Sequence, residues 1–144
     1  MRALIAAFLL LLSLTARAEL TIIQFDITTT AGGAELLASP LVEGCLLHAR
    51  YVANTMDTGA DLDVTGVITG VVLVNIDNAG TSDITRVIRT ATHDETGAAS
   101  LYAAAGEPVE ALICVKEELK LVVAQGGATK LGTLYLTFTD TLHP

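Results

Sequence analysis

Residues 119–139 read LKLVVAQGGATKLGTLYLTFT, and this stretch decides the fold. Apolar and polar side chains alternate on both sides of Gly126-Gly127. A period of two is typical of half-buried β-strands, and paired glycines are typical of a turn. We therefore predict strands over 119–124 and 133–139 that pair as a hairpin. The predicted inward residues are Leu119, Leu121, Val123, Leu134, Leu136 and Phe138, and the predicted outward residues are Lys120, Thr133, Thr137 and Thr139.

The same alternation continues through most of the chain. A strand is predicted over 20–29, with Ile23, Phe25 and Ile27 on its buried face. About eight short strands, Gly-rich turns and no long helical period predict an all-β fold, an antiparallel β-sandwich or barrel in one domain over 19–144. The other predicted strands cover 45–53, 60–65, 71–76, 83–89 and 109–115, with a loop over 31–40 and an irregular stretch over 90–106 that has room for a short helix.

The first 18 residues differ in character from the rest. Met1-Arg2 is a short basic start, residues 3–14 are apolar, and Ala16-Arg17-Ala18 fits the small-x-small rule of signal peptidase. This pattern predicts a signal peptide over 1–18 that is cleaved before Glu19. The alternative is an apolar N-terminal segment that is retained.

Charge and composition exclude several partners. The 144 residues contain 16 acidic and 8 basic side chains, which gives a net charge of −8. Phosphates would be repelled by such a surface, so we expect no nucleic-acid partner. Aromatic residues make up 4% and Trp is absent, so the core has to be built from aliphatic side chains.

Two cysteines, Cys45 and Cys114, stand in strand-like apolar stretches. In an oxidising compartment they could form a disulfide. Alternatively, both are small buried apolar residues. Their separation does not fit a zinc site.

In the stretch MDTGADLDV, residues 56–64, Asp57, Thr58 and Gly59 match the catalytic-loop motif of a retroviral-type aspartic protease. Such an enzyme needs two carboxylates that share a proton, so a chain this short would have to dimerise. However, Asn54-Thr55 separate the preceding strand from this loop, and no later segment matches the one that packs beneath it. We favour a turn that leads into a strand, keep the protease as a minor alternative, and otherwise expect no catalytic residues.

No cofactor, metal or small-molecule site is indicated elsewhere. Asp57, Asp61 and Asp63 do not have the spacing of an EF-hand loop. No serine lies in a nucleophile motif, and Gly126-Gly127 lacks the Lys-Ser/Thr of a phosphate loop. We therefore expect a protein that is not an enzyme.

Three blocks of sequence carry a resemblance. They are YVANTMDTGADLDVTG (51–66), RTATHDETGAASLYAAAGEPV (89–109) and LKLVVAQGGATKLGTLYL (119–136). In this order they resemble small structural proteins of tailed bacteriophages and prophages, which are encoded among head and tail genes. The resemblance implies a non-enzymatic virion protein, first a capsid decoration or stabilising subunit and next a tail component.

The same resemblance implies partners and a location. The partners would be other virion proteins, with the major capsid protein first, and further copies of the chain in a homo-oligomer such as a trimer. The signal-peptide-like segment departs from the pattern, because virions assemble in the cytoplasm. The alternative is therefore an exported bacterial β-domain in the periplasm or secreted.

Overall fold

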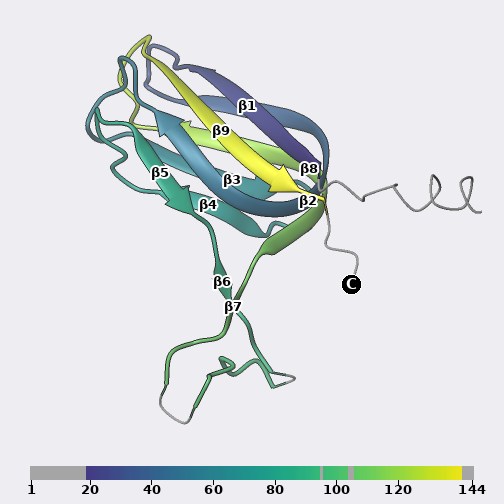
Figure 1. The fold of residues 1–144 in the computed structure, drawn as a ribbon. Helices are drawn as coiled ribbons and strands as arrows, with labels where there is room; N and C mark the ends of the chain where they lie inside the picture. Colours follow the sequence, from purple (N-terminus) through teal and green to yellow (C-terminus); the bar gives the residue numbers. More distant parts are fainter. Residues whose placement is uncertain (1–18, 95, 104–105, 141–144) are drawn as a thin grey trace, which may run out of the picture.

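The computed structural model describes residues 19–94, 96–103 and 106–140, so the predicted signal peptide lies outside the described residues. The described part is all-β, as predicted, and contains no helix, hence none that could cross a membrane (Figure 1). Its strands are β1 (Leu20–Thr28), β2 (Glu35–Val52), β3 (Asp61–Gly66), β4 (Val72–Ile76), β5 (Ile84–Val87), β6 (Thr90–Ala91), β7 (Glu110–Ala111), β8 (Ile113–Ala124) and β9 (Leu131–Thr139).

The strands form two layers that share β2. One layer has the order β1-β9-β2-β5, and the other has the order β2-β8-β3-β4, with every neighbouring pair antiparallel. The C-terminal half of β2 lies between β9 and β5, whereas its N-terminal half pairs with β8. A strand that passes from one layer to the other closes one side of the sandwich.

Irregularities in β2 allow this crossing. Its register with β8 shifts between Ala38 and Leu41, beside Pro40, which lacks the backbone N–H that a ladder needs. Gly44 follows, with a φ of 145°, and a Cβ there would lie 2.5 Å from the carbonyl oxygen of Thr139. Only glycine allows β2 to approach β9 this closely.

The core between the layers is aliphatic, with few aromatic side chains. Ile23, Phe25 and Ile27 of β1 are buried, which confirms the face predicted from their alternation. The six inward residues predicted for 119–139 are also all buried. Alternation therefore identified the buried faces correctly in these three strands.

The predicted hairpin over 119–139 is wrong. Strand β8 pairs with β2 and β3, and strand β9 pairs with β1 and β2, so the two strands lie in opposite layers. Their inward side chains meet across the core instead of side by side. Thr137 and Thr139 are also buried, contrary to the prediction, because neighbouring side chains cover that face of β9.

Two strand boundaries also differ from the prediction. Residues 31–40 are not a loop throughout, because β2 begins at Glu35 and continues past Pro40. Residues 109–115 and 119–124 are not two strands, because β8 runs unbroken through Lys116-Glu117-Glu118. This charged run continues the strand because Glu117 turns inward, where hydrogen bonds satisfy its carboxylate.

Residues 90–111 form an arm that leaves the sandwich. β6 and β7 pair at its base, and bridges join His93 to Ala99 and Leu101 to Pro108 further out. Figure 1 shows this arm projecting away from the layers. The short helix allowed for in this region is absent from its described residues.

Candidate functional site

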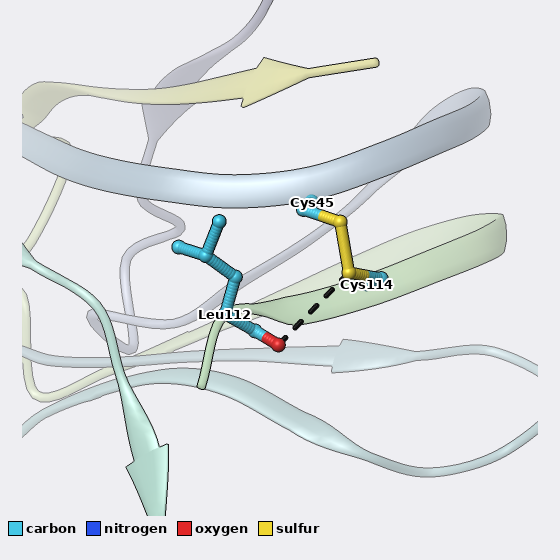
Figure 2. The surroundings of a disulfide bond; sticks show 3 residues. All are labelled: Cys45, Leu112 and Cys114. Carbon is cyan, nitrogen blue, oxygen red and sulfur yellow. Dashed lines mark hydrogen bonds between the residues drawn. A yellow bond between two sulfur atoms is a disulfide. The ribbon is translucent and has the colours of Figure 1, made fainter. Parts of the chain in front are cut away.

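Cys45 and Cys114 form a disulfide, with a sulfur–sulfur distance of 2.00 Å (Figure 2). The two residues face each other directly across β2 and β8. Cys45 is buried, whereas Cys114 is exposed and its sulfur lies 3.9 Å from the carbonyl oxygen of Leu112. The bond joins β2 near its crossing point to β8 just after the chain returns from the arm. A disulfide indicates an oxidising or extracellular setting.

Asp57 lies in the loop between β2 and β3, against the loop between β8 and β9. Its amide donates to the carbonyl of Gly126 over 3.1 Å, and its carboxylate lies 3.6 Å from the ammonium of Lys130. The Asp57 side chain is about half exposed at 54%. These contacts hold the two loops together.

The glycines of this region have different roles. Gly59 is outside the positive-φ region, and a Cβ there would meet nothing closer than 3.9 Å. Gly127 has a φ of 83°, and a Cβ there would overlap the carboxylate of Asp57. The sequence motif contains Thr58-Gly59, but the glycine that requires a positive φ is Gly127, in the adjacent β8–β9 loop.

The other carboxylates of the motif region are engaged by amides. Asp61 accepts from the amide of Asn78 over 2.8 Å and from the side chain of Gln125 over 2.7 Å. Asp63 accepts from the side chain of Asn75 over 2.7 Å. In the described part of the chain, no three His, Cys, Asp or Glu side chains are grouped so that they could hold a metal ion.

Glu117 organises the turn between β3 and β4. Its carboxylate accepts from the amide and the hydroxyl of Thr69 and from the amide of Ile68, at 2.5–3.0 Å. The hydrogen bonds from Thr69 hold the pKa of Glu117 below its ordinary value. Gly66 lies so close to this carboxylate that a Cβ would overlap it. The arrangement is a structural support for the turn, because the carboxylate oxygens already have donors.

Tyr51 is a buried phenol in the core. Its hydroxyl has no hydrogen-bond partner among the described residues. Burial, and secondarily the carboxylate of Asp83, raises the pKa of Tyr51 to about 12. The raised pKa favours the neutral phenol.

A groove of about 390 Å³ opens on the outer face of the first layer. Five residues of β1, β2 and β9 line it: Ile22, His48, Arg50, Tyr135 and Thr137. The strand register brings them together, because Thr137 is opposite both Ile22 and His48, and Tyr135 is opposite Arg50. A ring nitrogen of His48 lies 3.1 Å from the hydroxyl of Thr137.

Arg50 is the main charge of this groove. Its guanidinium lies 3.8 Å from the carboxylate of Asp83, and both side chains are more than half exposed. An exposed pair at this distance contributes little to stability, so the guanidinium keeps its capacity to bind an anion. The sequence placed His48 and Arg50 on one strand face, but only the strand order adds Ile22 and Tyr135.

Comparison with known proteins gives only weak likeness, to solved structures. No family model and no curated protein matches the chain. Among solved structures, the chain is similar to the structure of infectious bursal disease virus strain Gx, with 14% sequence identity and a TM-score of 0.30. The alignment covers 90% of this chain and 34% of that chain, so this chain spans about a third of the virus protein. At this TM-score, the resemblance to a virus structure carries no argument about function.

Proposed function

We propose that the chain is a non-enzymatic structural subunit of a tailed-phage virion, acting as a decoration or stabilising protein on the head. The observation that carries the proposal is the arm over 90–111. Figure 1 shows that this arm leaves the sandwich. Leu101 and Tyr102, which belong to it, are 42% and 77% exposed. Exposed apolar side chains on a projecting segment are typical of a surface that packs against a neighbouring molecule in an assembly.

The site geometry supports a structural role. Asp57, Asp61 and Glu117 use their carboxylates to hold loops and turns. Asp63 uses its carboxylate to bind Asn75 of the neighbouring strand. A general acid or base would instead need a titrating group that is free to reach a substrate. The three sequence blocks that resemble structural proteins of tailed phages are the reason for proposing a phage particle. A tail component is the second choice for the location in that particle.

The disulfide is compatible with this proposal. Oxidising conditions occur at virion surfaces as well as in the periplasm and outside the cell. Cys114 is exposed, so the bond could form after particles leave the reducing cytoplasm.

Mass spectrometry of purified particles tests the proposal. We expect peptides of this chain at a stoichiometry that matches the symmetry of the head, with a tail location giving a lower copy number. If the chain is missing from intact virions, the proposal is wrong.

An exported bacterial β-domain is the second candidate, and the Cys45–Cys114 bond is the observation that favours it. N-terminal sequencing separates the two. A mature chain that begins at Glu19 in a periplasmic or secreted fraction supports export, whereas an intact Met1 in assembled particles supports the virion.

A further inference from the structure

The arm carries both apolar and acidic side chains into solvent. Leu101 and Tyr102 are exposed, and Glu107 and Glu110 are exposed on the segment that returns to the sandwich. Neither glutamate is in an ion pair with another described residue. Asp94 differs, because its carboxylate accepts from the backbone of Thr96 and Ala98 and shapes the turn of the arm. The arm therefore offers an aliphatic–aromatic pair followed by free carboxylates.

The groove on the first layer has the opposite character. Ile22, which is 63% exposed, supplies an apolar wall, and Tyr135 supplies part of an aromatic ring. Arg50 supplies a guanidinium that is only weakly paired. A segment with apolar side chains and a nearby carboxylate fits this chemistry.

We propose that the arm of one copy seats in the groove of a second copy. Tyr102 would lie against the apolar and aromatic wall, and Glu107 would pair with Arg50. The arm points away from its own sandwich, so it is presented to a neighbour (Figure 1). The inference rests on the proposed function in one respect, since a structural subunit has to assemble.

This contact joins two different surfaces, and its repetition has a defined consequence. Each copy donates one arm and accepts one, which makes the interface head-to-tail. Such an interface gives a closed ring where the rotation closes, a trimer being one solution, and an open chain where it does not. A rotation of 180° closes a dimer in which two copies exchange arms, and smaller rotations close larger rings.

Light scattering coupled to size-exclusion chromatography tests the contact on the full chain. We expect the wild type to form a concentration-dependent assembly. Tyr102→Ala on the arm and Arg50→Glu in the groove should each raise the apparent Kd at least about tenfold, as for central contacts of an interface. Lys120→Glu is the matched control, because this exposed cation lies on β8 of the other layer and its reversal should leave assembly unchanged.

Two further measurements identify the pair of surfaces. Combining Arg50→Glu with Glu107→Arg in one chain reverses both charges and should restore assembly. Mixing Tyr102→Ala chains with Arg50→Glu chains leaves one intact arm and one intact groove, so dimers should form and growth should stop there. Because all these side chains are exposed, melting curves should show every variant folded.

Several outcomes would overturn the inference. The inference is wrong if the wild type stays monomeric at all concentrations. It is also wrong if neither Tyr102→Ala nor Arg50→Glu weakens assembly, or if the combined charge reversal does not restore assembly. These results are independent of the particle analysis. A monomeric chain found in virions would refute the arm contact and keep the proposed function, and an assembling chain absent from virions would do the reverse.

Discussion

Breaking the Cys45–Cys114 bond should cost a large part of the stability of this domain. The bond closes a loop with a sequence separation of 69 residues. In the chain-entropy account, a loop of this length removes about 15 cal/mol/K from the unfolded chain, which is about 4 kcal/mol near room temperature. A loss of this size lowers the Tm of a domain of this length by roughly 15 °C.

Urea unfolding with and without a thiol reductant measures the effect. We expect the reduced protein to keep its β-structure, because the β2–β8 ladder continues on both sides of the bond. Its free energy of unfolding should fall by about 4 kcal/mol, and its m-value should rise because the unfolded chain becomes more expanded.

The variant Cys45→Ala/Cys114→Ala separates the covalent bond from the packing of the sulfur atoms, and it should match the reduced wild type closely. A change of less than about 1 kcal/mol on reduction would refute the loop-closure reasoning. Free thiols that react in the folded wild type would show that the bond itself is absent.

Five other substitutions test local features, by urea or acid unfolding except where another assay is named. Tyr51→Phe removes a buried hydroxyl that lacks a described partner, and it should be neutral or stabilising by about 1 kcal/mol; a clear loss would reveal a hidden hydrogen bond. Gly127→Ala should destabilise by roughly 1–2 kcal/mol or more, whereas Gly59→Ala should stay within about 0.5 kcal/mol, and equal effects would contradict the assigned backbone conformations. Asp57→Asn should cost at most about 1 kcal/mol, and loss of a pepstatin-sensitive acidic peptidase activity in this variant would instead establish the protease. The pKa of Glu117 is lowered in the folded state, so its contribution to the free energy of unfolding is complete above the ordinary glutamate pKa of about 4.3 and is lost as pH falls through the folded-state pKa. The difference in stability between the wild type and Glu117→Gln should therefore narrow on acidification. A difference that stays constant with pH would contradict this.

The sequence predicted the buried faces better than the strand pairing. Alternation fixes which side of a strand is apolar, and this is why the inward side chains of β1, β8 and β9 were correct. The same alternation is compatible with many strand orders. The hairpin expected for β8 and β9 failed because β2, a strand far earlier in the chain, supplies neighbours for both.

The extent of β2 was hidden for a related reason. Proline and glycine are normally unfavourable within strands, and the sequence indicated a loop over 31–40 and a strand only from residue 45. In the structure, Pro40 and Gly44 fall where β2 bends between layers and where missing hydrogen bonds or side chains are required. A proline or glycine in a sequence is therefore compatible both with the end of a strand and with a bend inside a longer strand.

The groove was only half visible from the sequence. His48 and Arg50 share a strand face, which their spacing shows, but Ile22 and Tyr135 join them only through the pairing of β1, β9 and β2. The disulfide was left open between two alternatives. The pairing of Cys45 with Cys114 depends on the β2–β8 register, which composition does not determine.

The passage of β2 through both layers makes the sandwich a single cooperative unit. If β2 detaches, the layer β1-β9-β2-β5 loses an inner strand and the layer β2-β8-β3-β4 loses the partner of β8. We therefore expect the two layers to unfold together. Folding has to bring β2 to strands that are synthesised much later, and such distant pairing is slow to form. We therefore expect slow folding and slow unfolding to have one origin, the pairing of β2 with β8 and β9.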